Sequence, residues 1–263
     1  MTIHRSGWMR ASHSPDILSK MAKQAKVALV TGGAKRVGKA IVETLAAAGY
    51  DIAFTYQKSE ADASKLLTAL KKCGRKAVAI HEDLTLPNAA TNVIAEFSKT
   101  FNRLDILVNN ASLYAPSDLK SVREDLMARL WAIHVVTPMM LCKGFETMLR
   151  KSRGRVINMV DLLAERPWPP YLGYCASKAG LWNLTLGLAR ELAPEVTVNG
   201  IAPGVVEWPE DYPKADREKY LLRVPLARAG TPQDVAELVY FLCTGGDYIT
   251  GQIIRLDGGR SVT

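Results

Sequence analysis

The chain has 263 residues, of which 48% are hydrophobic and 23% are charged, so it can bury one large core as a single domain. Its net charge is +8, but the lysines and arginines are scattered and form no long basic block, so we expect no nucleic-acid partner. The four cysteines have neither C-x-x-C spacing nor a neighbouring histidine cluster. We therefore expect no disulfide framework and no metal site, and the simplest location is a reducing cytoplasm.

The first part of the chain differs in character from the rest. Residues 1–25 mix His, Ser and Lys and contain no apolar stretch of the kind found in a signal peptide, so we expect a poorly ordered tail. The remaining residues, 26–263, are predicted to form the domain. No apolar run reaches the roughly 18 residues needed to span a bilayer, so no membrane is expected.

From residue 26 onward, apolar runs alternate with helical patterns. The runs predict buried strands at 27–31, 51–55, 77–80, 106–109, 156–159, 197–201 and 252–255. Helices are predicted at 37–48, 61–73, 89–101, as a pair across 118–150, at 171–192 and at 233–243. The alternation predicts an α/β fold with one doubly wound, parallel, seven-stranded sheet of Rossmann type and helices on both faces. Residues 205–225 lack clear periodicity and are predicted to be a lid over the substrate.

A glycine-rich turn follows the first predicted strand. Segment 31–38 reads Thr-Gly-Gly-Ala-Lys-Arg-Val-Gly, and its small residues would let the backbone approach a pyrophosphate at the start of a helix. Arg36, with Lys58 and Ser59 after the second strand, would form a cationic and hydroxyl cluster where a ribose 2′-phosphate would lie. No acidic residue closes that strand, so NADPH is favoured over NADH. The alternative is that Arg36 and Lys58 are only solvated surface charges.

A second motif lies in the predicted helix 171–192. Tyr174 and Lys178 are four residues apart, which places them on one face of the helix. The ammonium is expected to lower the pKa of the phenol from about 10 and so make Tyr174 a proton donor. Thirteen residues earlier stands Asp161, whose carboxyl group could relay a proton if burial raises its pKa. The alternative role for Asp161 is to cap the loop before Leu162.

These motifs together resemble the short-chain dehydrogenase/reductase family, from Lys26 to the C-terminus. The resemblance implies catalytic roles for Asp161, Tyr174 and Lys178, although the family usually has Ser where this chain has Asp161. It implies an NADPH site whose residues are Gly32, Lys35, Arg36, Val37, Gly38, Lys58, Ser59, Asp83, Leu84, Asn110, Ala111, Ser112, Tyr174, Lys178, Pro203 and Gly204. It also implies a homotetramer, formed through the helices at about 125–150 and 171–192.

Within the family, the chain looks like the pteridine reductases. The likeness rests on the turn at 31–38, on Asp161, and on Asn-Asn-Ala-Ser at 109–112 followed by Tyr114. It implies a pterin or folate substrate held by Ser112, Tyr114, Asp161 and Tyr174, with Tyr114 stacking on the ring. Tyr114 could instead be ordinary loop packing. The alternative activity is reduction of a ketone, as in 3-oxoacyl-acyl-carrier-protein reductases.

Two neighbouring residues complete the prediction. His134 falls where the wider family has an Asn that holds a water leading to the Lys. Two roles are open for it: support of that water through an imidazole nitrogen, or a buried and satisfied histidine. Tyr171 is predicted to serve packing.

Overall fold

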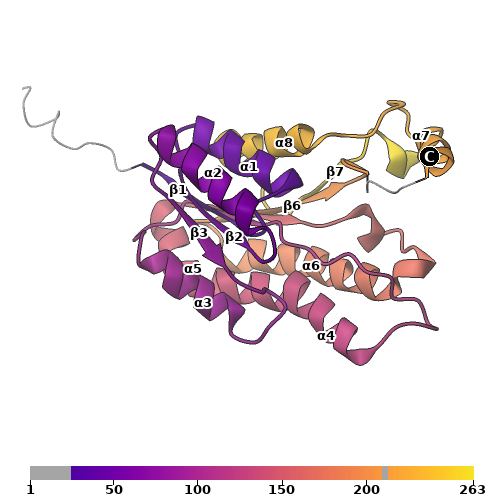
Figure 1. Cartoon of the computed structure of the whole chain (residues 1–263), viewed down its shortest axis with the longest axis horizontal. Helices are drawn as coiled ribbons and strands as arrows, with labels where there is room; N and C mark the ends of the chain where they lie inside the picture. The colour runs from indigo at the N-terminus through magenta and orange to yellow at the C-terminus, as the bar shows by residue number, and fades with distance from the viewer. Residues whose placement is uncertain (1–24, 209–212) are drawn as a thin grey trace, which may run out of the picture.

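The computed structural model describes residues 25–208 and 213–263. The tail predicted at 1–25 lies outside the described residues except for residue 25. Within the described part, the chain forms one parallel sheet with strands in the order β3-β2-β1-β4-β5-β6-β7 (Figure 1). The strands are β1 (Val27–Val30), β2 (Asp51–Tyr56), β3 (Ala77–His81), β4 (Ile106–Asn109), β5 (Arg155–Met159), β6 (Thr197–Pro203) and β7 (Ile253–Leu256). The predicted doubly wound sheet is confirmed, and its strand order reverses between β1 and β4.

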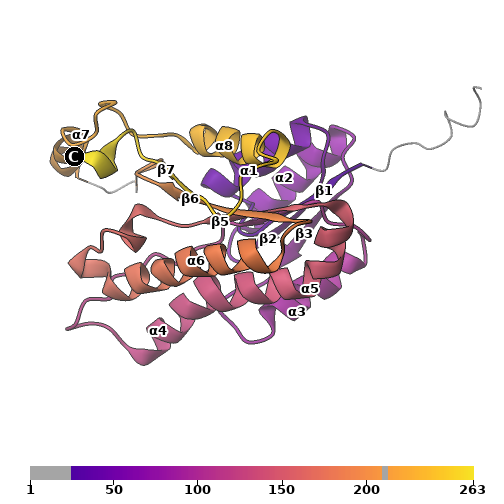
Figure 2. The ribbon, with the colours of Figure 1, turned by 180° about the vertical axis from the view of Figure 1, so that it is seen from behind.

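Helices cover both faces of the sheet, as Figures 1 and 2 show from opposite sides. One face carries α1 (Arg36–Ala47), α2 (Glu60–Lys72) and α8 (Pro232–Thr244). The other carries α3 (Ala89–Ser98), α5 (Thr137–Ser152) and α6 (Leu172–Glu191). Each layer buries its own apolar cluster, with Ile41 and Val239 on the first face and Phe97 and Phe145 on the second. Because both faces are covered, most residues of the strands are apolar.

The region predicted as a pair of helices is one continuous helix with a wider turn in it. Helix α4 (Glu124–Trp131) runs through a π-helical turn, η1 (Ala132–Val136), directly into α5. The combined helix, Glu124–Ser152, is long and apolar enough to cross a membrane by length and composition alone. In the fold, the residues of α5 that are buried, such as Leu141 and Phe145, pack on the sheet. Its apolar character therefore has a direct explanation in the core of the domain.

The predicted lid contains a helix that the sequence pattern did not reveal. Helix α7 (Lys214–Leu221) lies within the segment 205–225 and buries none of its residues. A helix with no buried face has no apolar periodicity, which is why the sequence showed none. Three short 3₁₀ turns complete the described chain: η2 (Leu162–Ala164), η3 (Pro169–Tyr171) and η4 (Arg260–Val262).

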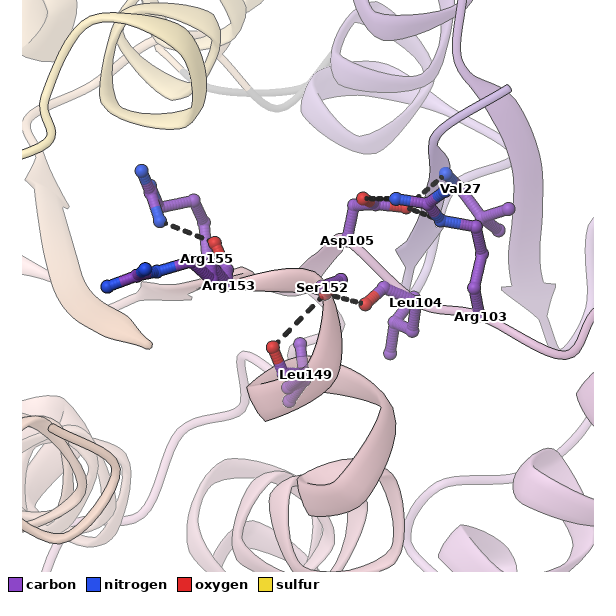
Figure 3. Close-up of polar contacts among 8 residues, drawn as sticks. All are labelled: Val27, Arg103, Leu104, Asp105, Leu149, Ser152, Arg153 and Arg155. Atoms are coloured by element: carbon purple, nitrogen blue, oxygen red, sulfur yellow. Dashed lines mark hydrogen bonds and ion pairs between the residues drawn. The ribbon is translucent and has the colours of Figure 1, made fainter. Parts of the chain in front are cut away.

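A buried carboxylate ties strands together at the amino end of the sheet, opposite the predicted site (Figure 3). Asp105 is 5% exposed and accepts a hydrogen bond of 2.8 Å from the backbone N–H of Val27. Both of its oxygens also accept from the guanidinium of Arg103, at 2.8 and 2.6 Å. The backbone N–H of Arg155 donates to the Asp105 carbonyl at 2.8 Å. One residue thus fixes the starts of β1, β4 and β5.

We predict that Asp105→Ala lowers the free energy of unfolding by about 2–4 kcal/mol, because it leaves a buried N–H and a guanidinium without their acceptor. Asp105→Asn retains one acceptor and should cost less. Asp247→Ala is the control, since Asp247 pairs with Arg155 at the surface with its side chain 82% exposed. Urea unfolding followed by circular dichroism measures all three. Equal losses for Asp105→Ala and Asp247→Ala would contradict the assignment.

Candidate active site

The glycine turn after β1 has the geometry of a backbone cradle. Gly32 has a φ of 63°, in the left-handed region, which an L side chain rarely adopts. A Cβ atom on Gly38 would lie 2.1 Å from the carbonyl oxygen of Gly32. The turn and the first residues of α1 therefore pack without side chains at these points. They leave backbone N–H groups at a helix start, which suits the pyrophosphate of a dinucleotide.

Arg36 occupies a strained position and turns away from the expected phosphate cluster. Its φ of 52° is in the left-handed region, where glycine is the usual residue. The guanidinium pairs with the Glu207 carboxylate at 2.5 Å, near the start of the segment predicted to be a lid. Lys35 instead pairs with Asp62 of α2 at 3.0 Å. Lys35, and not Arg36, thus extends toward the loop that carries Lys58 and Ser59.

A cavity of about 350 Å³ joins most of the predicted cofactor residues. Its lining includes Gly32, Lys35, Arg36, Val37, Gly38, Asp83, Leu84, Asn110, Ala111 and Ser112. The other predicted cofactor residues are not part of that lining: Lys58, Ser59, Tyr174, Lys178, Pro203 and Gly204. Sequence reasoning missed Thr55, Tyr56, Gln57, Glu82 and Ile133, which also line it. Four of these five stand at or just after the ends of β2 and β3, so their position at the carboxyl edge was the available signal.

Asn110 holds the turn in place. Its side-chain amide donates to the carbonyls of Thr31 at 2.8 Å and Gly32 at 3.1 Å. In return, the Thr31 hydroxyl accepts from the backbone N–H groups of Asn110 and Ala111 at 2.9 and 3.0 Å. The carboxyl ends of β1 and β4 are therefore fixed to each other, at the point where the strand order reverses.

The three predicted catalytic residues meet at the carboxyl ends of β5 and β6. Tyr174 and Lys178 lie one turn apart on α6, and their side chains are buried. The Tyr174 hydroxyl donates to Oδ2 of Asp161 at 2.7 Å, while Oδ1 of Asp161 accepts from the backbone N–H of Leu163 at 2.8 Å. The Asp161 carboxylate therefore makes the contacts of both predicted roles: one oxygen accepts from the phenol, and the other caps the turn η2.

The electrostatics of Tyr174 differ from the sequence expectation. Burial, followed by the Asp161 carboxylate, raises the pKa of Tyr174 well above its ordinary value. The expected lowering of the pKa of Tyr174 by Lys178 is wrong, because the Lys178 ammonium donates to the Met159 carbonyl at 2.7 Å and lies 5.8 Å from the phenol ring centre. Burial lowers the pKa of Lys178 itself to about 8. The phenol therefore keeps its proton and presents it to Asp161.

Aromatic rings lie beside the Tyr174 phenol. Tyr114 is 50% exposed and stacks on Tyr171, with ring centres 4.3 Å apart and planes at 17°. The edge of Tyr114 also meets Tyr174 at 4.8 Å, and Trp168 leans on Tyr171 at 5.3 Å. Tyr171, predicted to serve packing only, is thus the partner of the residue expected to stack on substrate. These rings form an apolar wall next to Asp161 and Tyr174.

His134 lies beneath this wall, in the π-helical turn. It is 1% exposed, and its ring faces Tyr174 edge-on with centres 5.4 Å apart. Its Nε2 atom is 2.9 Å from the Ser112 hydroxyl and its Nδ1 atom is 2.8 Å from the Ser177 hydroxyl. Of the two roles considered, this is a buried histidine whose nitrogens both have protein partners.

Comparison with known proteins places this geometry in a family. The profile of the family described as "Enoyl-(Acyl carrier protein) reductase" matches residues 32–261. Pteridine reductase 1 from Leishmania tarentolae is 34% identical over 91% of this chain and 97% of that protein. A 3-oxoacyl-[acyl-carrier-protein] reductase from Aquifex aeolicus is 34% identical over 90% and 97%. The chain belongs to the short-chain dehydrogenase/reductase family.

A solved structure supports the same family and fold. A blue fluorescent protein from a metagenomic library, solved in complex with NADPH, superposes with a TM-score of 0.85 at 34% identity, covering 90% of this chain and 98% of that one. The predicted family and fold are confirmed, and the protein is a reductase of this family. The pterin and ketone reductases are equally similar in identity, so the substrate has to be argued from the site.

We predict a pH-dependent penalty on stability from Lys178. Its pKa of about 8 lies below the ordinary value of 10.5, so burial of its charge opposes folding fully below pH 8. The penalty shrinks as pH rises from 8 to 10.5 and then disappears. The stability of Lys178→Met relative to the parent should therefore fall by about 2–3 kcal/mol between pH 7 and pH 10. Urea unfolding of both cofactor-free proteins measures this, and a constant difference would rule out the penalty.

Proposed function

We propose that the protein is an NADPH-dependent pterin reductase, which converts a dihydropterin or dihydrofolate to its tetrahydro form. The observation that supports this most directly is the 2.7 Å hydrogen bond between the Tyr174 phenol and a carboxylate, Asp161, where the family usually has a serine. Reduction of a ring C=N bond requires a proton on nitrogen, and a phenol paired with a carboxyl group can deliver one. Reduction of a ketone does not require the carboxyl.

The cofactor would lie along the cavity at the ends of β1 and β4. The turn at 31–38 would hold the pyrophosphate, Asp83 and Leu84 the adenine, and Tyr174 and Lys178 the nicotinamide ribose. The cradle around Gly32 and Gly38 fits such a group, because glycine at position 38 lets the turn pack directly on the start of α1, where a Cβ atom would lie 2.1 Å from the Gly32 carbonyl oxygen. When bound, NADPH supplies the hydride. Pro203 and Gly204, at the end of β6, would border the nicotinamide.

The chain's own residues would manage the substrate and the proton. Tyr114, supported from behind by Tyr171, offers a flat face for a heteroaromatic ring. Ser112 offers a hydroxyl to the edge of the ring. Tyr174 gives its proton to the ring nitrogen, and a proton taken up from solvent through the partly buried Asp161 carboxylate, which already contacts the phenol, restores it.

We also propose an oligomeric state and a cellular location for the protein. Trp131, Val136 and Met139 of the long helix and Leu186 of α6 are between 37% and 50% exposed, although all four are large and apolar. We propose that these faces meet in a homotetramer, in keeping with the prediction for the helices at about 125–150 and 171–192. We propose a cytoplasmic location, which suits the four free cysteines.

Turnover by the purified full chain tests the activity. With NADPH, dihydrobiopterin should be reduced with a higher kcat/KM than an acetoacetyl thioester. Tyr174→Phe is the control for true turnover, because loss of one hydroxyl should lower the rate by about 10² or more while the protein still binds NADPH. A higher kcat/KM for the thioester would favour ketone reduction and overturn the pterin assignment.

Asp161 has two contacts, and we predict that the one with Tyr174 matters for pterin reduction. Asp161→Asn can still accept from Leu163 but has no acidity, and Asp161→Ser introduces the residue usual in the family. Both should lower pterin reduction by about 10² or more and leave NADPH affinity largely unchanged. Steady-state kinetics and fluorescence titration with NADPH measure the two effects. Near-normal pterin turnover by Asp161→Asn would assign the carboxylate to capping η2 alone.

The choice of cofactor gives another prediction. The parent should prefer NADPH over NADH by about tenfold or more, because one charge-assisted contact to the 2′-phosphate is worth about 1.5–3 kcal/mol. Since Lys35 extends toward Lys58 and Arg36 pairs with Glu207, Lys35→Ala should reduce the preference more than Arg36→Gly. Dissociation constants of NADPH and NADH for the parent and for the two variants test this prediction. Loss of preference only in Arg36→Gly would restore the original role of Arg36.

A further inference from the structure

A second cavity adjoins the cofactor cavity, between helices α1 and α2, which are neighbours on one face of the sheet (Figure 1). Its volume is about 380 Å³. Its lining includes charged residues from both helices and from the turn before α1: Lys35, Arg36, Lys39, Glu43, Asp62 and Lys65. Lys35 and Arg36 line both cavities, so these two side chains lie between them. The Lys35 ammonium can therefore serve a partner on either side.

The partner that Lys35 has in the structure is on the side of the second cavity. Its ammonium pairs with the Asp62 carboxylate at 3.0 Å, and Asp62 lines the second cavity but not the cofactor cavity. The hydrogen bond from Lys35 lowers the pKa of Asp62 below its ordinary value, so the carboxylate is charged at neutral pH. The two side chains are 56% and 41% exposed, so the pair is weak and can open.

This pairing brings an acidic residue to a place where the sequence predicted none. In folds of this kind an acid at the end of the second strand accepts a hydrogen bond from the ribose 2′-OH of NAD. No acid closes β2 here, which favours NADPH. Asp62 instead reaches Lys35 from the first turn of α2. The cation that would hold the 2′-phosphate of NADPH thus already holds a carboxylate.

Binding of the phosphate by Lys35 disturbs this pair in either of two ways. If the ammonium turns on its flexible stem into the cofactor cavity, the hydrogen bond to Asp62 is lost. If it shares its three N–H donors between both anions, the carboxylate and the phosphate come close together and repel each other. NADH has a hydroxyl in place of the phosphate and makes neither demand. The charge of Asp62 therefore opposes the binding of NADPH more than that of NADH.

We propose that Asp62 is a specificity-determining residue: it competes with the 2′-phosphate for Lys35 and so limits the preference of the protein for NADPH. This inference rests on the proposed contact of Lys35 with that phosphate. The rival role for Asp62 is a brace that holds Lys35 in position for the phosphate. The two roles differ in sign, because loss of a competitor tightens NADPH binding and loss of a brace weakens it.

Asp62→Asn separates the two roles, because the amide keeps the size of the side chain and an acceptor oxygen but removes the charge. Exposed ion pairs are weak, so the dissociation constant of NADPH should fall by about two- to fivefold. That of NADH should change less than about 1.5-fold, since its 2′-hydroxyl makes no ion pair with Lys35. Fluorescence titration of the purified full chain with each cofactor measures both constants. Low ionic strength is used, because salt screens exposed charges.

Glu43→Gln is the matched control. It removes the same charge from another exposed pair of the second cavity, in which Glu43 contacts Lys39 at 2.6 Å. Glu43 lies about two turns along α1 from Lys35 and does not line the cofactor cavity. The control should therefore leave the ratio of the two dissociation constants close to that of the parent. An equal gain for NADPH in Glu43→Gln would overturn the proposal.

A double-mutant cycle with Lys35→Met shows whether Asp62 acts through Lys35. Competition predicts that Asp62→Asn has little effect on NADPH binding once the ammonium is gone. Weaker NADPH binding by Asp62→Asn alone identifies a brace, and unchanged binding shows no competition; either result overturns the proposal. An undiminished gain in the Lys35→Met background, or an equal gain for NADH, assigns the effect to the general field of the charge and overturns it as well.

Failure of this proposal is distinguishable from failure of the proposed function. The dissociation constants need no second substrate, so a protein that reduces ketones and not pterins gives the same test. An unchanged preference for NADPH in Lys35→Met would remove the contact on which the proposal depends. It would overturn the role of Asp62 and leave the reductase activity and its substrate untouched.

Discussion

The reciprocal contact between Thr31 and Asn110 is the constraint from which the site is built. A parallel sheet brings the carboxyl ends of all its strands to one edge, but only between β1 and β4 do the connections leave in opposite directions. At that point the Asn110 amide donates to two carbonyls of the glycine turn, and the Thr31 hydroxyl accepts two N–H groups in return. The cofactor cradle on one side and the loop with Ser112 and Tyr114 on the other are consequently set by one short network.

The second determinant is the way Asp161 divides its two oxygens. One oxygen fixes the turn that follows β5, and the other takes the proton of Tyr174. A serine in this place would have one oxygen in place of two, and it would bring no negative charge to the phenol. The carboxylate also adds to the effect of burial in raising the pKa of the phenol, which favours the protonated form of Tyr174. The Asp161 side chain thus both fixes the turn η2 and influences the pKa of Tyr174.

The sequence predicted the fold well because periodicity reports burial. All seven strands were predicted to within about two residues, since most of their residues are apolar. The sequence pattern did not predict helix α7, because none of its residues is buried. It did not predict the π-helical turn either, because that turn leaves the apolar pattern of the long helix unbroken. Motif spacing brought together Asp161, Tyr174 and Lys178. It did not reveal that Arg36 turns toward Glu207 or that Tyr171 supports Tyr114, because side-chain direction depends on contacts between segments distant in the chain.

The π-helical turn has a consequence for how this chain can change. Such a turn is equivalent to one extra residue in a helix, and insertions of that kind are ordinarily confined to loops. Here the extra residue lies between α4 and α5, in the middle of an element that packs on the sheet along its second half. Each residue of an α-helix turns the axis by about 100°. An insertion in the regular part of the helix would rotate α4 by that amount against α5, whereas deletion of a single residue within Ala132–Val136 would close the turn to a regular α-helix and leave both helices on their present faces. The π-helical turn therefore gives this packed helix a place where its length can change, as loops do elsewhere.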